Sequence, residues 1–331
     1  MNRRYAAAAF LLLALVGISV ASLALGPSGL GAREVVGALL NPAQATPMAR
    51  AIVWDARLPR LCLALAVGAA LAVAGAIMQG FFQNPMAAPS IIGVSSGAAL
   101  GATIAIISGA AATLPWLTLP ASAFTGALVA VVVVYILSRR GGRTPVELLL
   151  LSGIAVGSLA SAVASFIMIR GQRGDLDLVV FWMLGSLANR GWSEVGFVAA
   201  YAAVGTVVAV ALARYIDVLS LGDEQALYLG LDVERTRAAL LAVAALLAAA
   251  AVSVTGVIGF VGLIVPHICR IIFGPQHRTL IPASAVAGMV TLAAADLIAN
   301  LAGEVPVGVI TAMLGCPFFI WLLRRRAVRH L

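Results

Sequence analysis

The segment that decides the fold is residues 236–273, which read TRAALLAVAALLAAAAVSVTGVIGFVGLIVPHICRIIF. Neither an acidic residue nor an arginine interrupts it between Arg237 and Arg270. A run this long and this apolar predicts membrane-crossing helices, because strands and soluble core helices are shorter. The whole chain has the same character: 62% of its 331 residues are hydrophobic and 10% are charged. Soluble domains carry about a quarter charged residues, so we predict an all-α polytopic membrane protein.

Outward from this segment, the apolar stretches predict about ten transmembrane helices. The predicted spans are 5–26, 60–82, 91–110, 117–138, 146–169, 193–213, 236–257, 258–273, 280–301 and 307–323. The first follows Asn2-Arg3-Arg4 and resembles a signal peptide. Its apolar core is longer than the roughly 7–15 residues of a signal, so we interpret it as an uncleaved helix.

The 236–273 run is interrupted by Gly256, Gly259, Gly262 and Pro266, and it could cross the membrane once or twice. Positive residues favour the cytoplasmic side. A single crossing would leave nine spans and place the terminal Arg324-Arg325-Arg326 outside. Two crossings put both termini in the cytoplasm. The second crossing is slightly short for a membrane span, so we expect it to be broken at its glycines and sheltered by neighbouring helices.

With both termini inside, arginine divides unequally between the two sides. Seven of the 21 basic residues fall outside: Arg33, Arg50, Arg57, Arg60, Arg170, Arg173 and Arg190. All 21 are arginine, because the chain has no lysine. The phosphate-binding loop of NTPases requires a lysine, so this chain is not such an ATPase. The arginines are spread among loops rather than clustered on one face, which argues against nucleic-acid binding.

Few residues offer catalytic or metal-binding chemistry. Cys62, Cys269 and Cys316 lack metal or disulfide spacing and are interpreted as small buried hydrophobic residues. His267 has no second ligand nearby, so packing or capping is favoured over metal or haem binding. Asp296 is the one acid well inside a predicted span, where a structural hydrogen bond is favoured over a proton relay. The sequence therefore predicts neither an enzyme nor a metal site.

The largest charged loop is residues 219–235, LSLGDEQALYLGLDVER. Asp223 and Glu224 suit a helix start, Gly230 can end that helix in a left-handed cap, and Asp232 can start a second one. We expect two short helices whose apolar residues Ala226, Leu227, Leu231 and Val233 project into the cytoplasm. Residues of this type form either a knob for a soluble partner or an amphipathic loop resting on lipid headgroups.

At this point the sequence resembles a known family, the permease subunits of type II ABC importers, which import ferric siderophores, haem and vitamin B12. Besides 219–235, the segments that carry the resemblance are RLPR at 57–60, GAALAVAGAIMQ at 68–79, NPMAAP at 84–89, GVSSG at 93–97, FWMLGS at 181–186, GVIGFVGLIVPH at 256–267 and GEVPVG at 303–308. They occur in the family's order along nearly the whole chain. The family's ten spans with both termini inside equal the number reached from the residues.

The resemblance implies one permease domain over 1–331 in the bacterial inner membrane, paired as a homodimer. Two separate ABC ATPase subunits would bind ATP and Mg²⁺, no cofactor would be held by this chain, and a periplasmic binding protein would deliver cargo. By similarity, Arg57 and Arg60 dock acidic residues of that protein, Asn84 and Met86 form a cytoplasmic gate, and 144–147 assists. The residues implied in ATPase coupling are Gly222, Asp223, Glu224, Ala226, Leu227, Gly230, Leu231, Asp232 and Val233.

The sequence leaves the cargo open. Arg170, Arg173 and Arg190 on the outer side could attract an anion along a substrate path, which favours haem, then a ferric siderophore, over vitamin B12. Two other classes stay open as alternatives: an ion-coupled secondary transporter that depends on Asp296, and a structural or receptor membrane protein.

Overall fold

The computed structural model describes residues 2–26, 29–113 and 115–327. These residues are overwhelmingly helical, and the β pairing among them is the isolated bridge between Arg140 and Arg143. The elements in chain order are α1 (Asn2–Ala24), α2 (Ala32–Leu40), α3 (Pro47–Arg50), the π-helical turn η1 (Ala51–Arg57), α4 (Leu58–Phe81), the 3₁₀ turn η2 (Pro89–Ile92), α5 (Val94–Ile107), α6 (Ala110–Thr113), α7 (Pro115–Ser138), α8 (Val146–Met168), α9 (Arg173–Met183), α10 (Trp192–Leu219), α11 (Asp223–Tyr228), α12 (Val233–Thr255), α13 (Val261–Phe273), α14 (His277–Leu301) and α15 (Val307–Ala327).

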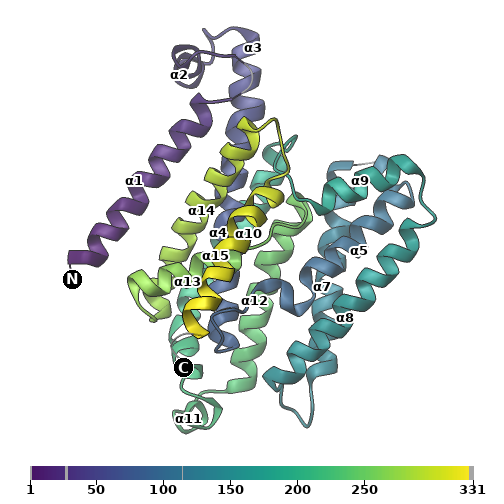
Figure 1. Ribbon diagram of the computed structural model, residues 1–331, viewed down its shortest axis with the longest axis vertical. Helices are drawn as coiled ribbons and strands as arrows, with labels where there is room; N and C mark the ends of the chain where they lie inside the picture. The colour runs from purple at the N-terminus through teal and green to yellow at the C-terminus, as the bar shows by residue number, and fades with distance from the viewer. Residues whose placement is uncertain (1, 27–28, 114, 328–331) are drawn as a thin grey trace.

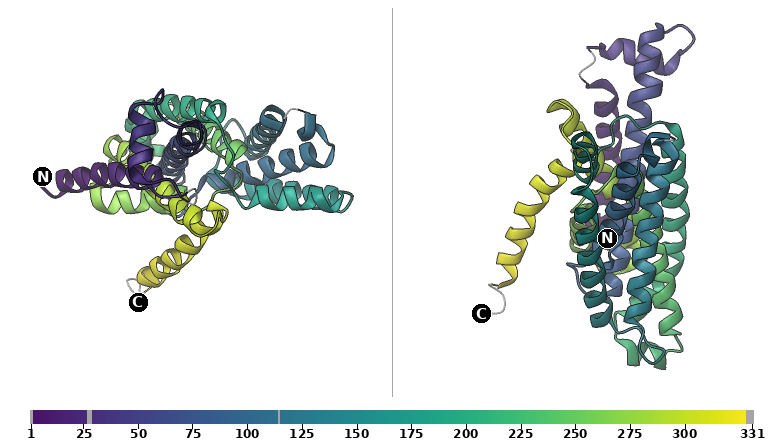
Figure 2. Two further views of the ribbon diagram at one scale, coloured as in Figure 1. Left: turned by 90° about the horizontal axis from the view of Figure 1, so that it is seen from above. Right: turned by 90° about the vertical axis from the view of Figure 1, so that its right-hand side faces the viewer.

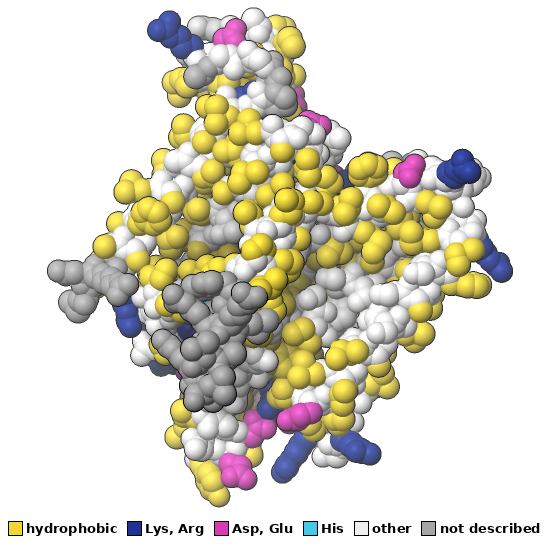
Figure 3. Space-filling model, viewed as in Figure 1, with side chains coloured by type: hydrophobic (Ala, Val, Ile, Leu, Met, Phe, Trp, Pro, Cys, Tyr) yellow, Lys and Arg dark blue, Asp and Glu magenta, His cyan; other side chains and the backbone are white. Residues whose placement is uncertain are grey.

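The helices confirm the ten predicted spans. Within the described residues, seven helices are long and apolar enough to cross a membrane. Three shorter apolar helices, Val94–Ile107, Val261–Phe273 and Val307–Ile320, occupy the remaining predicted positions. Space-filling colours agree with this topology, because most charged side chains gather at the upper and lower ends of the molecule and the middle is mainly apolar (Figure 3).

The predicted break in 236–273 is also confirmed. Helix α12 ends at Thr255 and α13 begins at Val261. Thirteen residues of α13 cover about 20 Å, which is short of the roughly 30 Å hydrocarbon core, so 256–260 completes the crossing without helical structure. Neighbouring backbone shelters it: a Cβ added at Gly256 would overlap the carbonyl oxygen of Trp182. Such a segment is tolerated at membrane depth where protein surrounds it.

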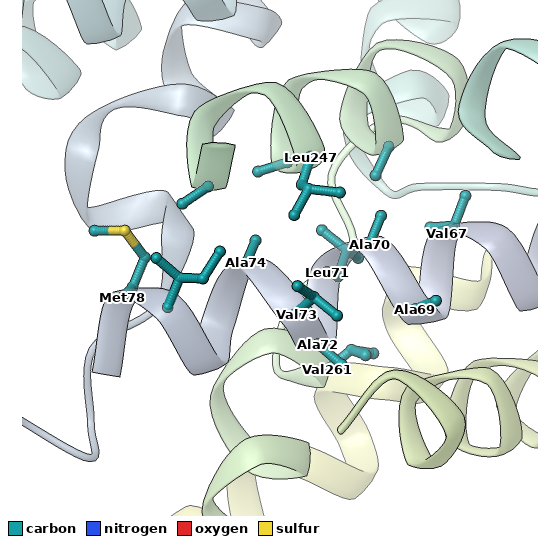
Figure 4. Close-up of a cluster of buried hydrophobic side chains, with 14 of the residues drawn as sticks. Val67, Ala69, Ala70, Leu71, Ala72, Val73, Ala74, Met78, Leu247 and Val261 are labelled. Carbon is teal, nitrogen blue, oxygen red and sulfur yellow. The ribbon is translucent and has the colours of Figure 1, made fainter. Parts of the chain in front are cut away.

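Helix α4 lies at the centre of the fold. Every residue from Ala66 to Phe81 is buried, and α10, α12, α13 and α14 all contact it. Leu247 of α12 and Val261 of α13 pack onto it from two sides (Figure 4). Because lipid tails are as apolar as the helices, close association depends on small residues that let backbones approach, and α4 is rich in alanine and glycine.

Two glycine pairs bring helices especially near to α4. A Cβ on Gly68 would overlap the carbonyl oxygen of Gly288 in α14, and a Cβ on Gly75 would overlap that of Gly262 in α13. Helices α5, α7, α8 and α9 form a second group on the right of Figure 1. There Gly97 of α5 meets the backbone of Gly126 in α7 in the same way.

Several helices outside the spans were not predicted, among them α2 and α3, which lie at the top of Figure 1, and α9, at its upper right. Helices α2 and α3 and the turn η1 share a small core of their own, formed by Val35, Ala38, Ala49 and Val53. The final helix, α15, leaves the bundle toward its C-terminal end (Figure 2). At the opposite end of the chain, Arg4 lies beside Gly274 in the turn between α13 and α14, so α1 begins near the inner ends of those helices.

Candidate functional site

The outer side carries a depression of about 400 Å³ that gathers three of the predicted arginines. Arg57 and Arg60 come from the start of α4, and Arg190 comes from the turn before α10. Asn189 and Glu304, which line the same depression, both hold left-handed backbone, with φ of 56° and 61°. Non-glycine residues in that conformation are uncommon and cluster at functional sites.

Arg60 is already paired within the chain. Its Nε donates to Asp296 Oδ2 at 2.9 Å and its Nη2 to Oδ1 at 3.0 Å, while Nη1 donates to Asn300 Oδ1 at 3.2 Å. The side chains of Arg60 and Asp296 are only 17% and 10% exposed. Arg60, predicted to dock an external partner, is thus bonded within its own chain. This two-bonded geometry is the strong form of the arginine–carboxylate pair, and it gives Asp296 a structural role between α4 and α14.

Arg57 is also engaged. Its Nη1 donates to the carbonyl oxygens of Leu23 and Ala24, the latter at 3.3 Å. These carbonyls end α1, where the last turn of a helix lacks backbone donors, so Arg57 caps that helix. Like Arg60, Arg57 is therefore bonded within its own chain, because the carbonyls of another helix lie within its reach.

The three arginines predicted along a substrate path do not share one place. Arg190 lines the depression, where burial lowers the pKa of its guanidinium and the charge of Glu194 opposes that shift. Arg170 lies in the turn after α8 and Arg173 at the start of α9; both are exposed, and neither is among the residues lining the depression. Arg170 stacks its guanidinium over the ring of Phe166, 5.3 Å from the centroid.

On the inner side, the helix starts and ends predicted at Asp223, Gly230 and Asp232 are confirmed. Helix α11 begins at Asp223, after Gly222 with φ of +105°. Gly230 follows its end with φ of +80°. Asp232 caps α12, because its Oδ1 accepts from the backbone N–H of Arg235 at 3.1 Å. The expected second short helix was wrong: what starts at Val233 is the spanning helix α12, since no helix breaker occurs before Gly256.

The exposed apolar surface of this region is formed by Leu227, Tyr228 and Leu229, which are 55%, 91% and 65% exposed. We call these three residues the α11 surface. Ala226 and Val233 are buried, so the expectation that they project into the cytoplasm was wrong. A one-and-a-half-turn helix has room for one inward face, and Ala226 occupies it against the bundle. Glu224 is exposed and Leu231 half-buried.

The predicted gate residues lie in the turn that follows α4. The Asn84 side chain accepts from the backbone N–H of Met86 at 2.9 Å, which closes a local turn. Asn84 is exposed and Met86 half-buried. The preceding residue, Gln83, has φ of 49° and donates from Nε2 to the carbonyl of Leu219 at 2.8 Å. We call residues 82–86 the gate turn, after the predicted gate residues. Gln83 joins this turn to the end of α10, shortly before α11.

Arg237 was not singled out in the sequence, although the structure gives it several buried contacts. Its side chain is 8% exposed, and it donates from Nη2 to Asp223 Oδ1 at 2.8 Å and from Nη1 to the carbonyl of Thr144 at 3.1 Å. A signal was present: an apolar stripe runs along α12 through Val233, Leu240, Leu241 and Ala244, and Arg237 falls on it at helical spacing. A charge within such a stripe needs a buried partner.

A polar cavity of about 760 Å³ also opens on the inner half, among α4, α10, α13 and α14. His267, Arg270 and His277 line it, and His277 Nδ1 lies 2.6 Å from Asp217 Oδ1. In the described part of the chain, no group of three or more His, Cys, Asp or Glu side chains is arranged to hold a metal ion. His267 lies in this cavity beside Arg270.

The chain as a whole is similar to known transport permeases. Residues 11–325 match the FecCD transport family. The chain is 47% identical over 287 residues to the cobalamin import system permease protein BtuC of Halobacterium salinarum, covering 86% of this chain and 76% of that one. It is 38% identical to the hemin transport system permease protein HmuU of Yersinia pestis, covering 96% and 95%.

A solved metal-chelate type ABC transporter in an inward-facing conformation has the same fold. It superposes with a TM-score of 0.84 at 30% identity, covering 95% of this chain and 97% of the other. ATP hydrolysis in such importers takes place on a separate subunit, so the chain itself is not an enzyme. The chain belongs to the FecCD transport family and is a multi-pass inner-membrane permease of a type II ABC importer for haem, siderophore or vitamin B12.

Proposed function

We propose that this permease moves cobalamin across the inner membrane, driven by ATP hydrolysis on two partner ATPase subunits that hold ATP and Mg²⁺. The observation that carries the cargo is the 47% identity to a permease named for cobalamin import, against 38% to one named for hemin transport. The argument for haem from the residues has weakened, because Arg190 lies in the outer depression and leaves only Arg170 and Arg173 exposed beside α9. Haem and ferric siderophore stay as the competing cargoes.

The outer depression is proposed as the docking point of the periplasmic binding protein. Arg57, Arg60 and Arg190 line it with Asp55 and Glu304. Arg60 is paired with Asp296 and Arg57 is held at the end of α1, so we assign the attraction of a partner's carboxylates chiefly to Arg190. Arg190→Gln is expected to raise the binding-protein concentration that gives half-maximal uptake roughly two- to fivefold, and more at low salt, where surface charges are less screened. Arg173→Gln, outside the depression, is the matched control; equal effects of both variants would contradict this assignment.

The inner surface is proposed to receive the ATPase. Helix α11 lies at the lower end of the molecule (Figure 1), and Gln83 joins the gate turn to Leu219, shortly before that helix. Helix α15 leaves the bundle (Figure 2), and we propose that it packs against a second copy in a homodimer. The exposed apolar faces of α8 and α15 suit contact with that copy and with lipid tails. Their exposed residues include Leu151, Ile154, Leu159, Met313 and Leu314.

The test is uptake into proteoliposomes that contain the permease, its ATPase and internal ATP, with the cargo-loaded binding protein outside. Cobalamin should accumulate only when ATP, ATPase and binding protein are all present. Accumulation of haem or a ferric siderophore instead would refute cobalamin as the cargo, but it would support the proposed ATP-driven import. Entry of any cargo without ATP, abolished by Asp296→Asn, would favour the ion-coupled alternative and refute the proposed function.

A further inference from the structure

Arg237 is the point at which four inner segments meet. Its guanidinium joins α12 to Asp223 at the start of α11 and to the carbonyl of Thr144, directly before α8. It also lies over the ring of Phe81, the last residue of α4, 5.9 Å from the centroid. Thr144 is held through its other backbone group too, because its N–H donates to Glu234 Oε1 at 3.0 Å. We call residues 219–235 the coupling segment, after their predicted role. Arg237 thus contacts this segment at Asp223, the last residue of α4 before the gate turn, and Thr144 just ahead of α8.

The burial of Arg237 makes these contacts interdependent. At 8% exposure its charge depends on protein partners, since a buried charge that loses its partner pays a desolvation cost. Arg235, two residues earlier, shows the contrast: its side chain is 90% exposed and pairs only with Asp232 on its own helix. Exposed pairs of that kind contribute little.

A second tie lies at the other end of the coupling segment, where Gln83 of the gate turn donates to Leu219. The chain from Leu219 to Arg237 is therefore bound to the end of α4 at both of its ends, through Gln83 and through Phe81. Helix α11, between these ties, carries the exposed α11 surface. A displacement of α11 by the ATPase must then carry the gate turn and the start of α8 along with it.

We propose that Arg237 is a positioning residue that makes α11, the gate turn after α4 and the start of α8 move as one unit, so that ATP hydrolysis is coupled to cargo movement. This inference rests on the proposed function.

The experiment measures uptake and ATP hydrolysis in the same proteoliposomes for wild type, Arg237→Gln, Arg237→Lys and Arg235→Gln. Arg237→Gln should still capture ATPase and hydrolyse ATP within about twofold of wild type, but cargo moved per ATP should fall roughly tenfold. Arg237→Lys should recover part of the ratio, because one ammonium group cannot hold both partners of the fork. Arg235→Gln should match wild type.

Two outcomes would overturn the proposal: an unchanged cargo-to-ATP ratio in Arg237→Gln, or a parallel loss of both activities together with a lower melting temperature, which marks a merely structural role. Should Arg237→Gln fail to fold, Asp223→Ala removes only the contact between Arg237 and α11 and should lower the ratio about threefold; an unchanged ratio would refute the proposal. Failure of wild type to import with ATP is a different result, which refutes the proposed function instead.

Discussion

Replacing Leu227, Tyr228 and Leu229 together with serine is expected to leave a folded permease that no longer captures its ATPase. These side chains are more than half exposed, so their loss removes little from the permease itself. Burying a large apolar side chain contributes about 1.5–3 kcal/mol. Losing three of them from one interface should weaken binding by about a thousandfold or more, which abolishes ATP-driven uptake.

The measurement is co-purification of the ATPase, followed by uptake. The control makes the same chemical change on the outer side, at Leu40 and Met48, which are 74% and 68% exposed. ATPase should remain bound in Leu40→Ser/Met48→Ser. If the α11 variant kept its ATPase, the coupling assignment would be wrong, and if it lost its fold, the surface would belong to the core of the permease.

The second large effect is expected at Gly75. A methyl group on Gly75 of α4 would overlap the carbonyl oxygen of Gly262 in α13, and neither backbone can yield without moving its helix. Overpacking in a tight core costs about 1–3 kcal/mol and occasionally more. We expect Gly75→Ala to lower the free energy of unfolding by about 3 kcal/mol, at the upper end of this range. Gly75→Leu should prevent accumulation of folded protein.

Thermal unfolding in detergent gives the shift for Gly75→Ala. Gly196→Ala is the control, because it lies in α10 with no neighbouring atom near the added Cβ. That substitution should be neutral or stabilising by up to about 1 kcal/mol, since alanine favours a helix over glycine. A melting temperature for Gly75→Ala equal to that of Gly196→Ala would show that α4 and α13 are further apart than the structure places them.

Prediction from sequence succeeded where the signal was local. The apolar runs defined the spans, and the glycines after Thr255 marked the break before α13. The caps at Asp223, Gly230 and Asp232 were also recognisable. Each depends on neighbours within a few residues, where backbone geometry and residue type are directly related.

The partners of the arginines were beyond such reasoning. Arg60 pairs with Asp296, 236 positions away, and Arg57 caps a helix that ends more than thirty residues earlier. Both arginines were predicted only as docking residues for an external partner. A sequence shows a charge, but it does not show the carboxylate or carbonyl that folding brings beside it. For Arg237 the apolar stripe of α12 indicated burial, yet it could not identify Asp223, Thr144 and Phe81 as the contacts.

By itself, then, the sequence determined that this chain is a polytopic membrane protein, how many times it crosses the membrane and where helix α11 starts and stops. These follow from hydrophobicity and from caps, which act over one or two turns. The tertiary structure alone decided which face of α11 is exposed, which arginines are already paired and how Arg237 joins the coupling segment to the gate turn. Those depend on helix packing through small residues at α4, which brings together segments that are far apart along the chain.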